Sequence, residues 1–252
     1  MTKETIFITD LDGTLVKDFR KVNDLDMQTI QNLKKQMKVG IATGRSNKEI
    51  EFIEEQTGIT VDFHIGFNGA MIDMHGERIF EKAIDQDTAN AVIDFIEKHE
   101  IEFDALDGDK RIGTYVPNDM DKLWNIELIR PDNLFEFLKN KKLYKINIRP
   151  IPEKGDKLLK DLQNKFPNVE ICKSGPMRIE ITPKNVNKGN ALDFIRERYN
   201  ANIVVAGDSE NDVTMFQKAD KAYCMDHADN SVKQYASTII HNFYELDQHI
   251  ID

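Results

Sequence analysis

The sequence has few cysteines and no long apolar run. Cys172 and Cys224 are its only cysteines, and they form no C-x-x-C pair. This argues against a disulfide framework or a zinc site and indicates a reducing compartment. No apolar segment reaches the roughly 18 residues that a membrane helix needs, and no signal peptide precedes the first predicted strand. We therefore expect a cytoplasmic protein that does not enter a membrane.

The chain also lacks an excess of positive charge and several familiar motifs. Its formal net charge of −10 argues against general nucleic-acid or anionic-membrane binding, although a local basic pocket for a small anion remains compatible with it. Without a G-x-x-x-x-G-K-[ST] loop, nucleotide kinase or ATPase activity is not expected. The six histidines are scattered and form no H-E-x-x-H, so we expect each to be structural or solvated.

The most informative stretch is a short apolar run, residues 6–9, followed by Asp10, Asp12 and Gly13. The run predicts a central strand buried on both faces, with the two acids at its carboxyl end. Residues two apart in an extended chain project to the same side, so both acids would share one site. Because like charges repel, this implies a bound cation, a raised pKa or both, and oxygen ligands favour Mg²⁺. Solvated acids in a turn are the alternative.

A second predicted strand, residues 38–42, ends in Thr43, Gly44 and Arg45. Ser46 and Glu49 then have the spacing of a capping box that opens a helix. A hydroxyl, a glycine amide and a helix start at one strand end form a place that accepts phosphate oxygens. An ordinary strand-to-helix turn is the alternative.

Two further strand or helix ends carry charged residues. Lys188 falls in the first turn of a predicted helix, the unfavourable end for a cation, so either an anion binds there or the lysine is solvated. The strand at residues 202–206 leads into Asp208, Asn211 and Asp212 before the next helix. Part of this acidity is helix capping, but Asp208 occupies the position on its strand that Asp10 occupies on the first.

Helices alternate with strands in residues 1–82 and again in 184–252, which predicts a parallel sheet. The last strand is expected at 221–225 and a helix at 231–236. Residues 83–183 have a different pattern, which we interpret as an inserted α+β domain. The predicted elements there are strands at 101–106, 111–116, 143–149, 169–173 and 178–182 and helices at 87–99, 131–140 and 155–166. The expected fold class is α/β, with a Rossmann-like parallel-sheet core.

Taken together, the four motifs resemble those of the haloacid dehalogenase (HAD) superfamily of phosphohydrolases. Within it, the chain looks like the Cof-type sugar phosphatases, which carry a large C2-type cap between the second and third motifs. The resemblance extends over nearly the whole chain. It implies a catalytic core of residues 1–82 and 184–252 and a cap of residues 83–183 that selects a small phosphorylated metabolite. We expect a monomer or a weak homodimer.

The resemblance also implies a role for each motif residue. Asp10 would be the nucleophile that forms an aspartyl-phosphate, and Asp12 would protonate the leaving oxygen and later deprotonate water. Mg²⁺ would be held by Asp10, the backbone carbonyl of Asp12, and Asp208, with Asp212 in support. The groups expected to hold the phosphoryl oxygens are the Leu11 amide, Thr43, the Gly44 amide, Lys188 and Asn211.

The chain departs from the family pattern in two segments beside the site. Asp226-His227-Ala228 stands where members usually have Gly-Asn-Ala, and residues 241–244 replace a terminal Asn-Gly segment. These departures leave the specificity open.

A phosphomutase of the phosphomannomutase type and a catalytically silent phosphometabolite-binding protein are the alternative functions. Retention of both Asp10 and Asp12 argues against the silent protein. Arg149 and Arg178 of the cap could contact a second anionic group, but we expect each to lie on a solvated face.

Overall fold

The computed structural model describes residues 3–16, 21–117, 125–174 and 177–250. The chain divides into two compact units, Met1–Phe80 with Asn187–Asp252 (unit 1) and Glu81–Val186 (unit 2). The inserted domain expected at 83–183 lies within unit 2. The α/β class is confirmed, with a mainly parallel sheet in unit 1. Among the described residues, no helix has both the length and the apolar character needed to cross a membrane.

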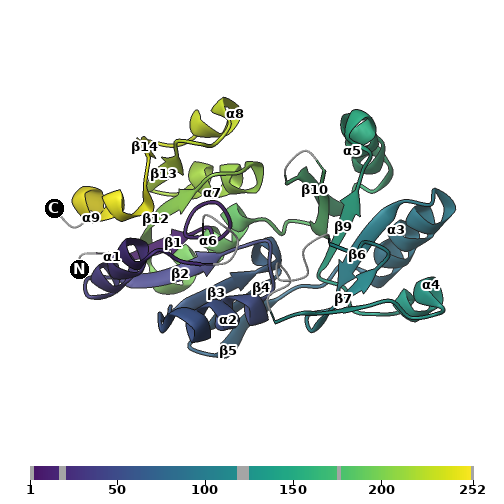
Figure 1. Ribbon diagram of the computed structural model, residues 1–252, viewed down its shortest axis with the longest axis horizontal. Coiled ribbons are helices and arrows are strands. Elements are labelled where there is room, and N and C mark those ends of the chain that lie inside the picture. The colour runs from purple at the N-terminus through teal and green to yellow at the C-terminus, as the bar shows by residue number, and fades with distance from the viewer. Residues whose placement is uncertain (1–2, 17–20, 118–124, 175–176, 251–252) are drawn as a thin grey trace. The chain divides into compact units, whose positions relative to one another are not determined.

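Unit 1 contains an eight-stranded sheet in the order β14-β13-β12-β1-β2-β3-β4-β5 (Figure 1). Its strands are β1 Glu4–Thr9, β2 Lys38–Ala42, β3 Phe63–Gly66, β4 Met71–Met74, β5 Glu77–Glu81, β12 Ala201–Gly207, β13 Lys221–Met225 and β14 Thr238–Ile240. The central strand β1 pairs in parallel with both β12 and β2. Ile6, Phe7 and Ile8 are fully buried, which confirms that this strand is covered on both faces.

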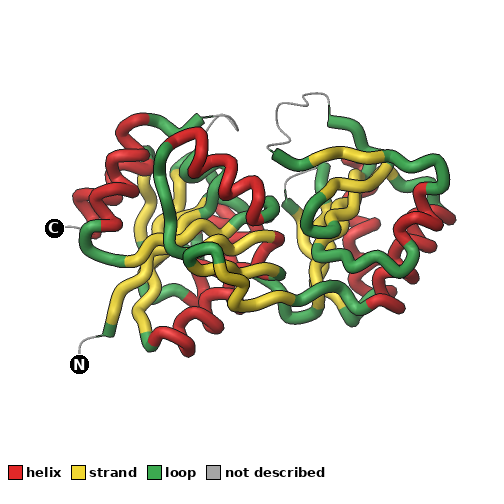
Figure 2. Tube along the Cα trace, turned by 90° about the horizontal axis from the view of Figure 1, so that it is seen from below, coloured by secondary structure: helices red, strands yellow, loops and turns green. Residues whose placement is uncertain are grey.

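Helices lie on both faces of the unit 1 sheet (Figure 2). They are α1 Asp24–Lys34, α2 Asn47–Thr57, α6 Lys188–Tyr199, α7 Val213–Lys218, α8 Asn230–Lys233 and α9 Leu246–Ile250. The predicted capping box starts α2, because the side chains of Ser46 and Glu49 each accept a hydrogen bond from the other's backbone N–H. Gly58 ends this helix in the left-handed conformation, with φ 69°.

The end of the chain differs from the prediction. Residues 221–225 are not the last strand, because β14 follows and pairs in parallel with β13. This strand has three residues and only Ile240 is buried, so it leaves no clear pattern in the sequence. The helix expected at 231–236 ends at Lys233, and Tyr235 beyond it is 42% exposed.

Unit 2 contains a six-stranded sheet in the order β10-β11-β9-β6-β7-β8. Its elements are α3 Gln86–Lys98, β6 Glu102–Leu106, β7 Lys110–Gly113, β8 Glu127–Ile129, α4 Leu134–Leu138, β9 Lys145–Arg149, α5 Gly155–Lys165, β10 Val169–Lys173 and β11 Ile179–Pro183. Ile93 of α3 and Leu162 of α5 share one apolar core with Phe103 and Ile146 of the sheet. Helix α4 is shorter than predicted, and Asn140 after it takes a left-handed φ of 63°.

The prediction of a solvated Arg149 is wrong. Its side chain is 8% exposed, donates to Asp104 at 2.7 Å and lies over the Tyr115 ring, 4.1 Å from the centroid. Arg111 donates to the same carboxylate at 2.9 Å. Burial would raise the pKa of Asp104, but the two guanidinium groups outweigh burial and hold it below its ordinary value. Arg178 is 45% exposed and lies 3.7 Å from Glu180.

Candidate active site

Asp10 and Asp208 follow two adjacent parallel strands. Thr9 of β1 lies opposite Ala206 of β12, and the Asp10 N–H donates to the Ala206 carbonyl at 2.8 Å. Both acids therefore leave the sheet at the same edge. One carboxylate oxygen from each of Asp10, Asp208 and Asp212 lies within 4.8 Å of the other two. We call these three residues the acidic cluster.

Lys188 begins α6 and lies against the acidic cluster. Its ammonium group donates to Asp10 and, at 2.6 Å, to Asp212, and its side chain is fully buried. The alternative of a solvated lysine is therefore wrong. Burial by itself would lower the pKa of Lys188, but Asp10 and Asp212 outweigh burial and raise it above 10.5. These carboxylates also offset the unfavourable position of a cation at a helix N-terminus.

Asp212 holds the loop that carries Asp208. Its Oδ2 accepts from the backbone N–H groups of Asp208 at 2.9 Å and Ser209 at 3.0 Å, while its Oδ1 accepts from Lys188. The side chain is fully buried. With both oxygens engaged, Asp212 is placed to orient Asp208 and Lys188.

The acidic cluster carries more negative charge than its surroundings balance. Burial raises the pKa of Asp10 well above its ordinary value; Lys188 opposes this, while Asp212 and Asp208 add to it. Among the described residues, nothing hydrogen-bonds to the buried Asp10 Oδ2. The pKa of Asp208 is raised by burial and by Asp212, against the effects of Thr14 and His227. When all three carboxylates are ionised, the Lys188 ammonium group leaves two of their negative charges unbalanced, so the ionised cluster fits a divalent cation that prefers oxygen ligands.

Gly13 and Thr14 place the Asp208 carboxylate. The Thr14 hydroxyl donates to Asp208 Oδ1 at 2.9 Å. Gly13 has φ +93°, and a Cβ atom there would lie 2.4 Å from Asp208 Oδ2. The glycine is thus required both by the backbone turn and by the close approach of this carboxylate.

The Asp12 side chain is bound by Arg45, a contact that the sequence did not predict. Arg45 Nε donates to Asp12 Oδ2 at 2.7 Å and Nη2 donates to Oδ1 at 2.8 Å. Nη1 donates to Glu49 at 3.1 Å. Burial would lower the pKa of Arg45, but Asp12 and Glu49 raise it above its ordinary value. The only signal in the sequence was the spacing of Arg45 and Glu49, which are four residues apart on the start of a helix.

The residues predicted to hold phosphate lie at neighbouring strand ends in unit 1. Thr43 is buried, and its hydroxyl accepts from the Arg45 N–H at 3.1 Å, which fixes the loop that contains Gly44. Leu11 is fully buried in the turn after β1. Asn211 donates to the side-chain oxygen of Asn68 at 3.2 Å, so Asn68, which was not predicted, joins this group.

His227 follows β13 and lies beside the acidic cluster. Its Nε2 atom is 3.3 Å from Asp208 Oδ2, and its side chain is 54% exposed. We expected each histidine to be structural or solvated, and that expectation did not predict that His227 lies beside the acidic cluster.

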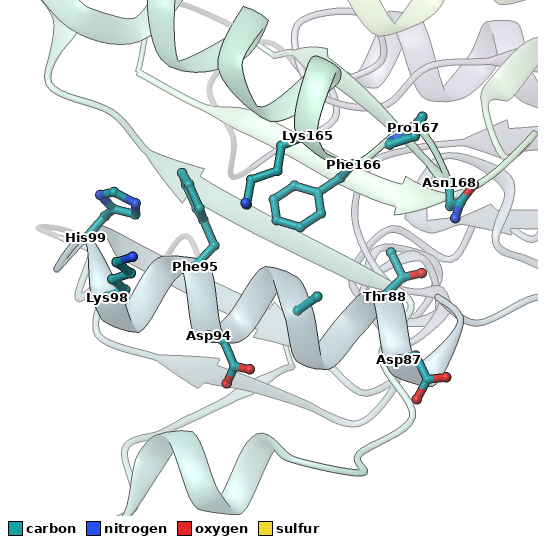
Figure 3. A pocket seen from close by; sticks show the side chains of 11 residues that line it. Asp87, Thr88, Asp94, Phe95, Lys98, His99, Lys165, Phe166, Pro167 and Asn168 are labelled. Carbon is teal, nitrogen blue, oxygen red and sulfur yellow. The ribbon is translucent and has the colours of Figure 1, made fainter.

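Unit 2 contains a cavity of about 550 Å³ between α3 and the end of α5 (Figure 3). Phe95 and Phe166 line it, with their rings edge-to-face at 5.7 Å, together with Lys165 and His99. All of its lining residues belong to unit 2, whereas every predicted site residue belongs to unit 1. The residues predicted to carry out the chemistry therefore lie at the strand ends described above, and none of them lines this cavity.

Comparisons with known proteins identify the family to which the chain belongs. Residues 7–247 match the family model of haloacid dehalogenase-like hydrolases. A Bacillus subtilis 5-amino-6-(5-phospho-D-ribitylamino)uracil phosphatase is 27% identical, over 91% of this chain and 87% of its own. A crystal structure of a Thermotoga maritima protein is 30% identical over 95% of this chain and 92% of its own, with a TM-score of 0.78.

A solved sugar phosphatase of HAD subclass IIB has the same fold. Its TM-score is 0.79 at 23% identity, and the match covers 98% of each chain. The chain therefore belongs to the haloacid dehalogenase-like hydrolase family.

Proposed function

We propose that the protein is a Mg²⁺-dependent phosphatase of small phosphorylated metabolites, sugar phosphates among them, that works through an aspartyl-phosphate on Asp10. The observation that carries this proposal is the acidic cluster itself, in which three carboxylates offer oxygens within 4.8 Å of one another beside the buried Lys188 ammonium group. Such a cluster is costly to maintain without a cation, and it lies at the strand end that carries the predicted nucleophile.

Asp10, Asp208 and the backbone carbonyl of Asp12 would hold Mg²⁺, with Asp212 behind them. When bound, the ion would reduce the repulsion between the Asp10 carboxylate and the negatively charged phosphoryl group. Asp10, Asp208 and the Asp12 carbonyl each offer an oxygen, the donor that suits this ion.

Asp10 attacks the substrate phosphorus, so that a bond forms between a carboxylate oxygen and phosphorus while the bond from phosphorus to the leaving oxygen breaks. Oδ1 of Asp10 is held by Lys188, which leaves Oδ2 as the attacking atom. Lys188 and Thr43 then face the phosphoryl oxygens, together with the Leu11 and Gly44 amides and Asn211. These donors stabilise the charge that redistributes in the transition state.

Asp12 gives a proton to the leaving oxygen in the first half of the reaction. In the second half it takes a proton from the water that attacks the aspartyl-phosphate, which releases inorganic phosphate and restores Asp10. Arg45 holds Asp12 for these steps.

We assign the chemistry to unit 1 and the choice of substrate to unit 2, which acts as the cap. The Bacillus subtilis relative acts on a phosphorylated ribityl compound and the subclass IIB neighbour on sugar phosphates. Both substrates carry a phosphate on a polyhydroxylated carbon chain, and we propose the same class here. The protein would work in the cytoplasm, as a monomer or weak homodimer.

A phosphomutase of the phosphomannomutase type would use the same residues in unit 1 but return the phosphoryl group to a sugar. The release of inorganic phosphate separates the two functions. We favour the phosphatase, because the relatives whose names state an activity are phosphatases.

The test is phosphate release by the purified protein from sugar phosphates, flavin mononucleotide, pyridoxal phosphate and para-nitrophenyl phosphate. We expect release that requires Mg²⁺, is abolished in Asp10→Asn, and persists in Asp24→Asn, a control at an exposed acid on α1. No release from any compound, para-nitrophenyl phosphate included, would contradict the proposal.

A further inference from the structure

His227 brings a nitrogen donor to the acidic cluster. Its Nε2 atom lies 3.3 Å from Oδ2 of Asp208, and 54% of its side chain is exposed. The other oxygen of Asp208 is held by Thr14. Because Gly13 has no side chain, nothing at that position displaces Oδ2. The imidazole therefore contacts the carboxylate oxygen that Thr14 leaves uncommitted.

The spacing of these two atoms suits two ligands of one ion. Donor atoms about 2.1 Å from an octahedral ion, at right angles to each other, lie about 3 Å apart. A neutral imidazole with its proton on Nδ1 offers a lone pair at Nε2. His227 can therefore donate an electron pair to a cation that Asp208 also binds.

A nitrogen ligand changes which ions a site prefers. An all-oxygen site suits Mg²⁺, whereas imidazole favours first-row transition metals. We propose that His227 is a further ligand of the cation at Asp10 and Asp208, and that the site thereby binds Mn²⁺ and Co²⁺ in preference to Mg²⁺. This inference rests on the proposed function only in placing a divalent cation at the acidic cluster.

The chain offers a matched control for His227. His241 Nδ1 lies 3.1 Å from Asp226 Oδ2, and its side chain is 73% exposed. It is thus an exposed histidine paired with an aspartate, but its partner is outside the acidic cluster. Replacing His241 removes an equivalent pair and leaves the proposed ligand in place.

The experiment compares the wild-type protein, His227→Asn and His241→Asn by calorimetric titration with Co²⁺ and with Mg²⁺, and by the visible absorption spectrum of bound Co²⁺. For His227→Asn we expect Co²⁺ affinity to fall about 10–100-fold and the spectrum to change. Mg²⁺ affinity should change by less than about threefold, because magnesium gains little from nitrogen. His241→Asn should match the wild type.

Unchanged Co²⁺ affinity and spectrum in His227→Asn would overturn the inference. An equal loss of Co²⁺ and Mg²⁺ affinity would also overturn it, because His227 would then only orient Asp208. If His227→Asn does not fold, the NMR spectrum of the Co²⁺-loaded wild-type protein decides the matter: a strongly hyperfine-shifted imidazole N–H resonance assigned to His227 supports ligation, and its absence overturns the inference. Metal binding through His227 without phosphate release from any compound would refute the proposed function and leave this inference standing.

Discussion

Arg45 donates to both carboxylate oxygens of Asp12, through Nε at 2.7 Å and Nη2 at 2.8 Å. The same guanidinium group is anchored by Glu49, which is fully buried. This bidentate pair fixes the Asp12 side chain after the end of β1. Each of these oxygens accepts one N–H and keeps a second lone pair, so Asp12 can carry a proton on an oxygen that Arg45 holds in place.

The first prediction concerns Asp12 as the general acid. In Asp12→Asn, kcat/KM for a sugar phosphate should fall about 10²–10⁴-fold, because an alkoxide leaves poorly without a proton. For para-nitrophenyl phosphate the loss in kcat/KM should be much smaller, since nitrophenolate leaves without protonation. Equal losses for the two substrates would contradict the acid role.

The second prediction concerns Arg45 itself. Arg45→Lys keeps the charge but loses the bidentate geometry, so kcat/KM should fall by about 10–100-fold through misplacement of Asp12. Arg78→Lys is the matched control, because Arg78 also donates to both oxygens of an aspartate in unit 1, Asp73. Steady-state kinetics of the two variants should differ, with Arg78→Lys close to wild type.

The third prediction concerns the approach of Gly13 to Asp208. Gly13→Ala should abolish Mg²⁺ binding, because the new methyl group would displace the Asp208 carboxylate. Gly76→Ala is the control: Gly76 has φ +80°, and a Cβ atom there would have no neighbour within 4 Å among the described residues. Both variants should lose about 1–2 kcal/mol of unfolding free energy from the positive φ. Calorimetric Mg²⁺ titration should separate them, and retained binding in Gly13→Ala would contradict this account.

The fourth prediction concerns the Lys188 ammonium group. Lys188→Met removes the ammonium group that partly balances the acidic cluster. The unfolding free energy, measured in a metal chelator, should therefore fall by about 3–5 kcal/mol. Mg²⁺ should restore part of that loss in a denaturant titration. Lys145→Met in unit 2 removes another buried lysine, one paired with Glu180 at 2.7 Å, and Mg²⁺ should restore nothing there. Equal rescue of both variants would argue against a cation at the cluster.

The fifth prediction concerns pH. The pKa values of Asp10 and Asp208 are raised in the folded, metal-free protein, so it holds protons where the unfolded chain has lost them. The unfolding free energy of the metal-free protein should therefore fall as pH rises from about 3.8 through the raised pKa values. Lys188 adds a fall of the same sign, but only in alkali, since its contribution is complete below pH 10.5 and is lost as pH rises through its raised pKa.

Mg²⁺ binding should displace the protons on these carboxylates, so its affinity should rise with pH. Calorimetry in two buffers of different ionisation enthalpy measures the protons released. Affinity that does not depend on pH, with no proton release, would contradict this electrostatic interpretation.

Much of the fold could be predicted from local patterns in the sequence. The buried strand at residues 6–9 and the capping box at Ser46 depend on neighbouring residues, and both are confirmed. The strand β14 and the helix α9 were missed because they are short and only partly buried. Such elements form through tertiary contacts, which a periodic pattern of apolar residues does not reveal.

The side-chain pairings of the site depend on contacts between distant segments. Lys188 is buried against Asp10, which lies 178 residues earlier in the chain. This contact cannot be seen from the residues around Lys188, and its position in the first turn of a helix therefore suggested a solvated side chain. Asp12 follows Thr9, the last residue of β1, by three positions, so strand alternation no longer determines which partner it meets. Motif spacing could indicate that these residues act together, but only the fold shows that Arg45 binds Asp12.

The most direct test of the central proposal is to trap the covalent intermediate. The protein is mixed with radiolabelled substrate and Mg²⁺, quenched in acid within milliseconds, digested and mapped by mass spectrometry. We predict an acid-stable, hydroxylamine-sensitive phosphoryl group on the peptide that carries Asp10, absent in Asp10→Asn. The same experiment is run on Asp12→Asn, in which the second half of the reaction is slowed. Phosphate release by the wild-type protein, with no label on Asp10 at any quench time in either protein, would contradict the proposal.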